Sequence, residues 1–178
     1  FTKLFVAETK KLVVGDPLDV KTDVSAMINP GEVARIKAWI DEAKAQGAVV
    51  ATGAEFTERT CTPTVMVNVK PDMKIVCVET FAPIVSIVPY ETLDEAIALV
   101  NDTELGLNAG IYTNVLTDAL KAADELQAGA VIINDIPTFR TDNMPYGGVK
   151  MSGYGKEGIK YAVEEMTDLK FITMKLSY

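Results

Sequence analysis

Residues 92–133, TLDEAIALVNDTELGLNAGIYTNVLTDALKAADELQAGAVII, contain the pattern that decides the fold class. A capping box at Thr92 predicts the start of a helix, and a strand is expected at 109–113. A second helix ends at Gly129, just before a short apolar strand at 131–133. Helices that alternate with short apolar strands are typical of α/β proteins, whose parallel strands are covered on both faces. We therefore predict an α/β fold, a three-layer sheet with helices on both faces.

The first half of the chain carries elements of the same kinds. Asn29-Pro30-Gly31-Glu32 has the residues of a helix N-terminus, and apolar residues follow it at helical spacing up to Gly47. A shorter amphipathic helix is expected within residues 1–12. Apolar runs predict four strands, at 48–51, 65–69, 75–78 and 83–88. In the helix that starts at Thr92, the side chains expected to face inwards are Leu93, Ala96, Ile97 and Val100.

Composition limits the classes of function. The 178 residues are 48% hydrophobic, which suffices for a sizeable core, and no apolar run is long enough to cross a membrane. With 17 Lys and Arg against 25 Asp and Glu, the net charge of −8 disfavours nucleic acid as a partner. Two cysteines favour a reducing, cytoplasmic setting. Because the chain has no histidine, it cannot form a Ser–His or Cys–His pair or a histidine-ligated metal site, and we predict no metal site.

Five of the twelve glycines lie in Pro145–Gly158, PYGGVKMSGYGKEG. Residues 153–158 satisfy the pattern G-x-G-x-x-G, which in dinucleotide-binding folds follows a strand and opens a βαβ unit. Here only one helix and one strand are expected after the pattern. We therefore interpret this stretch as a turn that allows close approach of the backbone, followed by the start of a helix.

Three side chains are candidates for chemistry in the first half of the chain. Cys77 lies inside the apolar run 75–78 and is interpreted as an inert core residue, while Arg59 gives Cys61 only weak support as an activated thiol. Glu79 directly follows the apolar run, where an unpaired carboxylate is costly. It is either a functional carboxylate or a surface residue at the end of a strand.

Another candidate site follows the last strand of the alternating pattern. Asn134 ends that strand, and the loop 135–143, DIPTFRTDN, leads to the glycine-rich stretch. Loops at the carboxyl ends of strands hold the binding sites of α/β sheets. Arg140 is the cation in this loop that is best placed to bind an anionic substrate. The alternative is that it pairs with Asp135 or Asp142.

The motifs described so far occur in the order in which they occur in the aldehyde dehydrogenase superfamily, and the chain resembles the C-terminal part of that family's catalytic domain. The family comprises NAD(P)-dependent enzymes that oxidise aldehydes to carboxylic acids. The loop 135–140 most resembles the lactaldehyde and semialdehyde type of branch, which acts on small hydroxylated or anionic aldehydes. The resemblance rests on VGDPLD at 14–19, ETFAP at 79–83, NDT at 101–103, LGL at 105–107, GAVIIN at 129–134 and PYGGVKMSGYG at 145–155.

The resemblance implies roles for individual residues. Glu79 would hold the hydroxyls of the nicotinamide-side ribose of NAD or NADP, and Phe81 would lie beside the nicotinamide. Ala82 stands where the family usually has glycine, and its methyl group would shift Phe81. The wall of the tunnel for the aldehyde substrate would include Asn134, Phe139, Arg140 and Tyr146.

The resemblance also implies that no catalytic residue lies in this chain, because the family's nucleophilic cysteine and general-base glutamate belong upstream of Phe1. We accordingly expect a fragment that is inactive alone. Residues 1–168 would be the C-terminal part of the catalytic domain, and 169–178 a strand whose segment 170–176 joins a neighbouring subunit in a homo-oligomer. The alternative is a non-catalytic binding or interaction module that retains the fold.

Overall fold

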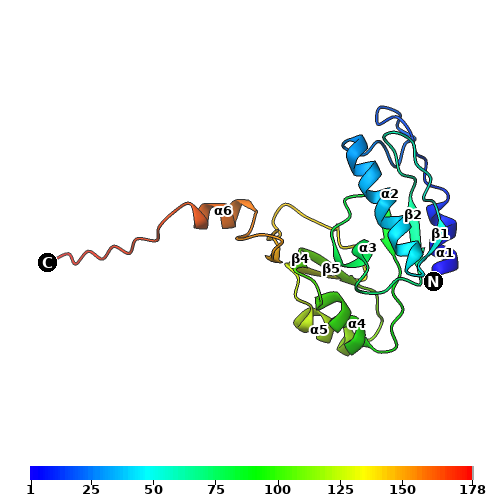
Figure 1. Ribbon diagram of the computed structural model, residues 1–178. Helices are drawn as coiled ribbons and strands as arrows, with labels where there is room; N and C mark the ends of the chain where they lie inside the picture. The colour runs from blue at the N-terminus through cyan, green and yellow to red at the C-terminus, as the bar shows by residue number, and fades with distance from the viewer. Residues whose placement is uncertain (178) are drawn as a thin grey trace. The chain divides into compact units, whose positions relative to one another are not determined.

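The computed structural model describes residues 1–177, and the chain divides into two compact units, Phe1–Pro89 and Tyr90–Tyr178 (Figure 1). The first unit contains α1 (Thr2–Thr9), α2 (Pro30–Ala45), β1 (Val49–Thr52), β2 (Thr64–Val67), α3 (Lys74–Cys77) and β3 (Ile84–Ser86). The second contains α4 (Leu93–Asn101), β4 (Leu105–Gly106), β5 (Asn108–Ile111), α5 (Leu116–Glu125), β6 (Ala130–Ile133), β7 (Val149–Lys150) and α6 (Ile159–Glu165). The predicted α/β class is confirmed.

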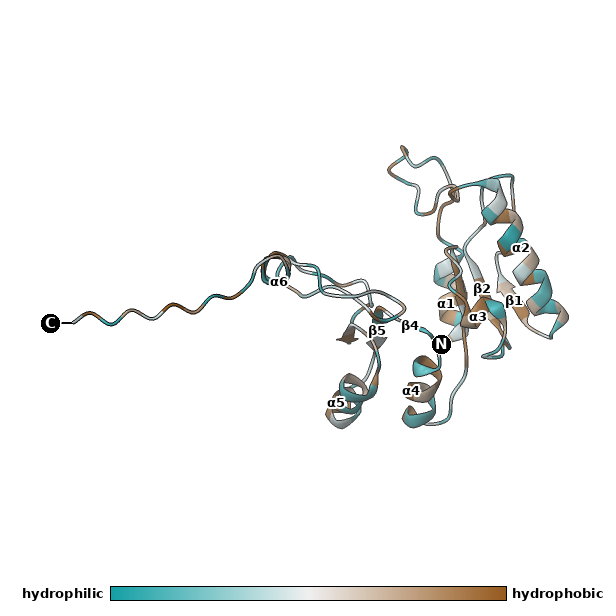
Figure 2. Cartoon of the chain, turned by 60° about the vertical axis from the view of Figure 1, so that its left-hand side comes forward, coloured by the Kyte–Doolittle hydropathy of each residue, from teal (hydrophilic) through white to brown (hydrophobic). Residues whose placement is uncertain are grey.

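The sheet of the first unit has the order β1–β2–β3, with β1 antiparallel and β3 parallel to β2. Thr64, Val65 and Met66 of β2 are all buried, so both faces of this central strand are covered. Figure 2 shows α1 and α2 on opposite sides of β1 and β2. This arrangement agrees with the prediction of helices on both faces. Across residues 1–177 the strands form three small sheets, the other two being the pairs β4–β7 and β5–β6.

Helix α2 forms for the reasons that its sequence indicates. The Asn29 side chain accepts a hydrogen bond from the backbone N–H of Glu32 at 3.0 Å, and Pro30 occupies the first helical turn. Hydrophilic and hydrophobic residues alternate along the helix (Figure 2). The side chains that it buries are Val33, Ile36, Ile40 and Ala43.

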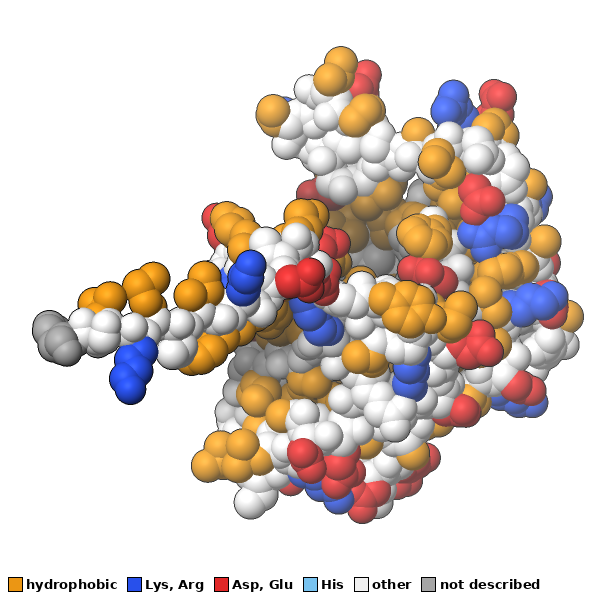
Figure 3. Space-filling model, turned by 90° about the vertical axis from the view of Figure 1, so that its left-hand side faces the viewer, with side chains coloured by type: hydrophobic (Ala, Val, Ile, Leu, Met, Phe, Trp, Pro, Cys, Tyr) orange, Lys and Arg blue, Asp and Glu red, His pale blue; other side chains and the backbone are white. Residues whose placement is uncertain are grey.

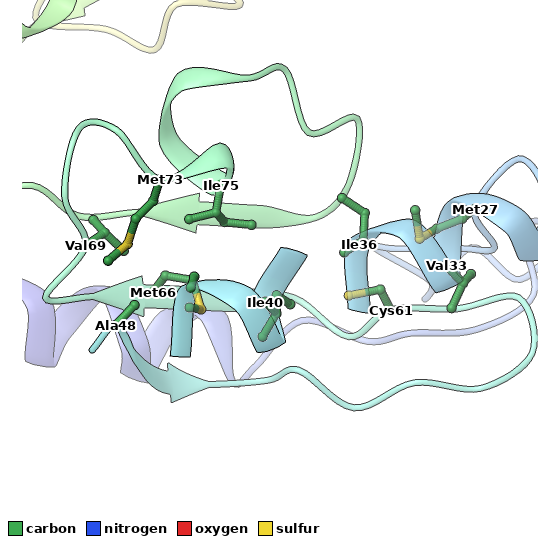
Figure 4. Close-up of a cluster of buried hydrophobic side chains, with 11 residues drawn as sticks. Met27, Val33, Ile36, Ile40, Ala48, Cys61, Met66, Val69, Met73 and Ile75 are labelled. Carbon is green, nitrogen blue, oxygen red and sulfur yellow. The ribbon is translucent and has the colours of Figure 1, made fainter. Parts of the chain in front are cut away.

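The buried face of α2 packs into a core of apolar side chains (Figure 4). Met66 enters this core from β2, and Met73 and Ile75 enter it from the segment that contains α3. Because these side chains come from elements far apart in the sequence, the core ties α2, the sheet and α3 together. It thereby holds the chain that leads from α3 to β3, which carries Glu79 and Phe81.

The strand predicted at 75–78 is wrong, because Lys74–Cys77 form a single helical turn, α3. Met73 and Ile75 point into the core, whereas Cys77 and Val78 are exposed. A short apolar run has no periodicity that separates a buried strand from a buried helical turn. The interpretation of Cys77 as a core residue fails for the same reason, since it assumed a strand buried on both faces.

The second unit is built on the parallel pair β5–β6, in which Ala109 lies opposite Val131 and Ile111 opposite Ile133. Helices α4 and α5 lie next to each other (Figure 1), and the Thr92 hydroxyl caps α4 by accepting a hydrogen bond from Glu95 N–H at 3.2 Å. Of the four α4 side chains expected to face inwards, Ile97 is buried but Val100 is 51% exposed. The buried face of α4 is therefore narrower than predicted.

The end of the chain follows α6. Residues 166–177 are assigned to no helix or strand, and their large apolar side chains are exposed. Figure 3 shows apolar side chains along the segment that ends at the grey terminal residue. The strand expected at 169–176 is not formed by the described part of this single chain, and its pairing with another subunit stays a prediction. Within residues 1–177, no helix is long and apolar enough to cross a membrane.

Candidate functional site

The first unit presents the sequence Glu79-Thr80-Phe81-Ala82-Pro83 on a loop between α3 and β3. Glu79 is exposed, and Phe81 is 78% exposed. Phe81 has a φ of 47°, in the left-handed region that bulky side chains rarely adopt. An aromatic residue held in a costly backbone conformation with its ring in solvent has no role in packing the core. These features fit a loop that presents a carboxylate and an aromatic face to a ligand.

Hydrogen bonds on both sides of Phe81 hold this loop. The Arg35 guanidinium donates a hydrogen bond to the carbonyl oxygen of Thr80 at 2.8 Å, although the two residues are 45 positions apart. The Ala82 carbonyl accepts a hydrogen bond from Ile84 N–H at 2.7 Å. Ala82 packs against the core with its methyl group, so the residue that departs from the family pattern is accommodated. Arg35 was not predicted as part of a site from the sequence.

Asn134 lies in the second unit, where β6 ends and the loop 135–143 begins. Its side-chain oxygen accepts a hydrogen bond from Thr113 N–H at 2.8 Å, and its side-chain nitrogen donates one to the Thr113 carbonyl at 2.9 Å. The φ of Asn134 is 59°. The side chain thus extends the pairing of β5 and β6 by one further residue. In this position it fixes the point from which the loop departs.

Arg140 and Tyr146 are in contact within the second unit. The guanidinium carbon of Arg140 lies 4.1 Å from the centroid of the Tyr146 ring. Its nitrogen lies 3.6 Å from a carboxylate oxygen of Glu157, and Glu157 is bridged to Tyr146 by two backbone hydrogen bonds. The expected alternative, a pair with Asp135 or Asp142, is wrong, because the glycine-rich stretch folds back and brings Glu157 to Arg140.

The Arg140 side chain is 46% exposed, and its contact with Glu157, at 3.6 Å, is longer than an ordinary hydrogen bond. A guanidinium with five donors, one covered face and no full partner can still bind a planar anion. Phe139, the preceding residue of the loop, is also half-exposed. The loop therefore presents an apolar and a cationic side chain next to each other.

The glycine-rich stretch forms turns and leads into α6, as predicted, but it also contains β7, which pairs with β4 and was not predicted. A Cβ atom added to Gly129 would collide with the carbonyl oxygen of Gly147, so these two backbone segments touch. Tyr146 and Gly147 also line an open hollow of about 390 Å³ together with Leu107, Gly148, Ser152, Gly153, Tyr154, Gly155, Lys156, Glu157 and Glu165. Gly153, Gly155 and Gly158, the glycines of the G-x-G-x-x-G pattern, all have positive φ, so the conformation of the turn accounts for them without a bound pyrophosphate.

Of the two cysteines, Cys61 and not Cys77 is the core residue. Cys61 is fully buried in the core, and this burial raises the pKa of its thiol. Cys77 is exposed. A buried thiol with a raised pKa is a poor nucleophile at neutral pH, because the thiolate is the reactive form.

Comparison with known proteins gives a match to the aldehyde dehydrogenase family over residues 1–172. The chain is 46% identical over 176 residues to 3-sulfolactaldehyde dehydrogenase of Priestia aryabhattai and 42% identical over 174 residues to lactaldehyde dehydrogenase of Methanococcus maripaludis. These alignments cover 99% and 98% of the chain. The chain spans 37% of the length of each of these curated relatives.

The fold matches a solved structure at a similar level of identity. A crystal structure of glyceraldehyde-3-phosphate dehydrogenase from Methanocaldococcus jannaschii, complexed with NADP, superposes with a TM-score of 0.90 at 40% sequence identity. The superposition covers 95% of this chain and 37% of that one. The family match, the two relatives and the shared fold agree, and the chain belongs to the aldehyde dehydrogenase family.

Proposed function

We propose that this chain forms the C-terminal part of an NAD(P)-dependent aldehyde dehydrogenase, which oxidises an aldehyde to a carboxylic acid. The observation that carries the proposal is the loop 79–83, in which Glu79 and Phe81 are exposed and the backbone is held in a left-handed turn. Such a loop fits a nicotinamide nucleotide, because a carboxylate accepts hydrogen bonds from ribose hydroxyls and an aromatic face covers a planar ring. When bound, NAD or NADP would supply the acceptor for the hydride.

The proposed substrates are small hydroxylated or anionic aldehydes. The relatives described above are named for lactaldehyde, which is neutral, and for 3-sulfolactaldehyde, which carries a sulfonate. Arg140 supports an anionic substrate, since its guanidinium is half-exposed and meets Glu157 only at 3.6 Å. Asn134 and Tyr146 would act mainly by holding the loop and the guanidinium in place.

We further propose that the chain alone does not oxidise aldehydes. Covalent catalysis by this family's chemistry needs a reactive thiol and a base, and the buried Cys61, with its raised pKa, is unsuited to the first role. Cys77 is exposed, but its Sγ contacts only the carbonyl of Asp72 within hydrogen-bonding distance. This contact supplies neither a cation nor a base that would activate the thiol as a nucleophile.

A chimera tests the proposed function. The N-terminal part of the Methanococcus maripaludis lactaldehyde dehydrogenase, up to the point where the alignment begins, is joined to this chain. We expect the chimera to form NADH or NADPH from lactaldehyde, whereas the 178-residue chain forms neither. A folded chimera that binds cofactor but forms no product would contradict the proposal and favour a non-catalytic binding module. Turnover by the chain alone would refute the claim that it lacks a nucleophile.

The same chimera tests the role of Arg140. Replacing Arg140 by Met should lower the specificity constant for 3-sulfolactaldehyde by about 1.5–3 kcal/mol, roughly ten- to hundred-fold, because charge-assisted hydrogen bonds are lost. Lactaldehyde, which lacks the sulfonate, should be nearly unaffected. Arg59→Met removes the same charge from the first unit and serves as the control. Equal losses for the two aldehydes would mean that Arg140 only holds the loop.

We also propose that residues 170–176 pair with another subunit in a homo-oligomer. Phe171, Ile172 and Met174 are between 74% and 86% exposed, and an extended apolar segment of this kind is stabilised by pairing along its edge. Deletion of 169–178 from the chimera should reduce its oligomeric state in analytical ultracentrifugation. An unchanged oligomer would contradict this assignment.

A further inference from the structure

We propose that Arg35 is a positioning residue, which sets the backbone of the loop 79–82 and thereby the orientation of Phe81. The inference rests on the proposed function in one respect, namely that this loop is the one that faces the cofactor. Arg35 acts on the loop through the carbonyl oxygen of Thr80.

The Arg35 side chain is held from three directions. Two of its nitrogens, Nε and Nη2, donate to the same carboxylate oxygen of Glu32 at 2.8 and 2.6 Å. The guanidinium carbon lies 4.3 Å from the centroid of the Trp39 ring, so one face of the group is covered. All three residues belong to α2, and Glu32 and Trp39 lie one turn before and after Arg35. One N–H of Nη2 is used by Glu32, and these contacts fix the direction in which its second N–H points.

The second N–H of Nη2 donates to the carbonyl oxygen of Thr80. The Thr80 carbonyl belongs to the peptide unit directly before Phe81, so holding its oxygen restrains rotation about φ of Phe81. That φ is 47°, a left-handed value that is unfavourable for a residue with a bulky side chain. Hydrogen bonds from a charged donor are among the strongest in proteins, and the bond from Arg35 offsets this cost. Without it, the loop would relax toward ordinary backbone conformations.

A simple surface ion pair would not have this effect. Glu32 and Arg35 are three residues apart on a helix, and such exposed pairs are worth little. Here, however, the Arg35 side chain is only 28% exposed, and its third partner is a backbone carbonyl outside the helix. The pair with Glu32 therefore orients the guanidinium for its bond to the loop.

The first test uses the 178-residue chain and needs no enzymatic activity. Backbone ¹⁵N relaxation gives the order parameters of Thr80, Phe81 and Ala82, which should lie near about 0.85 in the wild type, as in rigid backbone. Arg35→Met should lower them to below about 0.6, the value of flexible segments, while the order parameters of α2 and β2 stay unchanged. Lys37→Met removes a charge from an exposed position of the same helix and should leave the loop rigid.

Trp39 is the only tryptophan of the chain and therefore gives a second readout. Loss of the guanidinium from the face of its ring should raise the acrylamide quenching constant about two-fold in Arg35→Met, and Lys37→Met should not change it. Arg35→Lys covers the case in which the Met variant does not fold. The ammonium of lysine lacks the planar arrangement of donors that lets the guanidinium bind Glu32 and Thr80 at the same time. The loop should therefore become mobile in Arg35→Lys as well. Unchanged order parameters at 80–82 in a folded variant would overturn the proposal.

The chimera described above connects the loop to the reaction. Arg35→Met should lower kcat about ten-fold, with the KM for lactaldehyde within two-fold of the wild-type value, because orientation of the cofactor is lost and aldehyde binding is not. A rise in the aldehyde KM at constant kcat would contradict this role. The relaxation result stands whether or not the chimera is active, so failure of this inference and failure of the proposed function are distinguishable.

Discussion

Replacement of Asn134 separates the two contributions that this residue makes at the end of β6. In Asn134→Ala, both hydrogen bonds to Thr113 are lost and a residue with an ordinary side chain must keep a φ of 59°. Each bond is exposed and contributes about 0.5 kcal/mol, the low end of the range for neutral pairs. The left-handed conformation costs alanine about 1–2 kcal/mol, a cost that asparagine partly avoids. The expected loss is therefore about 2–3 kcal/mol.

Asn134→Gly is the matched control, since it loses the same hydrogen bonds but adopts the left-handed conformation readily. It should lose about 1.5–2 kcal/mol, from the bonds and from the greater freedom of glycine in the unfolded chain. The glycine variant should therefore be more stable than the alanine variant by about 1 kcal/mol, although glycine is the smaller residue and usually the more destabilising one.

Amide hydrogen exchange of β5 and β6 measures these free energies within the second unit, without assuming that both units unfold together. The Thr113 amide adds a local readout. It should exchange faster in both variants, and stay protected in Asn134→Asp, which keeps the acceptor oxygen. Equal stabilities of the alanine and glycine variants would refute the backbone contribution. Unchanged exchange at Thr113 would refute the hydrogen bonds.

Further predictions concern packing, titration and the cofactor loop. Gly129→Ala should lose about 3 kcal/mol in urea unfolding, the upper end of the cost of overpacking, because the new methyl group meets backbone atoms; Gly110→Ala, whose nearest neighbour would be at 3.3 Å, should lose less. Burial raises the pKa of Cys61, so the unfolding free energy should fall as pH rises above the pKa of the unfolded thiol, and Cys61→Val should remove that dependence; parallel pH profiles of the two proteins would contradict this. In the chimera, Glu79→Gln should slow single-turnover hydride transfer about ten-fold while cofactor still binds, and an unchanged rate would exclude the ribose contact.

The helices and the paired strands were predictable where a local chemical signal marks their boundaries. Asn29 and Thr92 are caps, and in both cases the side-chain oxygen accepts the expected N–H three residues later. The parallel pair β5–β6 was predictable because a helix separates two short apolar runs, and such a connection favours parallel strands. In each case the signal and the structure that it specifies lie within a few residues or one helix of each other.

The remaining features depend on contacts that no local pattern contains. The sequence predicted neither the helical turn at 74–77 nor the exposure of Cys77, because only the packing of Met73 and Ile75 distinguishes it from a strand. Arg140 meets Glu157, 17 positions away, only because the glycine-rich stretch folds back on the loop. The spacing of Glu32 and Arg35 does indicate an ion pair on α2, but the bond to Thr80 depends on tertiary structure.

Left-handed backbone occurs within the sequence motifs at residues other than glycine. Among residues 1–177, five residues other than glycine have positive φ; Phe81, Asn134 and Lys150 lie in stretches that carry the family resemblance, and Ala54 and Asn68 do not. A specific polar contact accompanies each of the three residues in these stretches. Arg35 binds the carbonyl of Thr80, directly before Phe81, and the Asn134 side chain binds the backbone of Thr113. The Lys150 ammonium donates to the carbonyls of Asn101 and Thr103. An unfavourable conformation persists only where surrounding contacts determine it. Selection for stability alone would favour glycine at such positions. At Asn134 and Lys150 the side chain itself makes hydrogen bonds that glycine could not make, which accounts for the residues found there. At Phe81, whose side chain is exposed, the proposed contact with the nicotinamide would account for the residue.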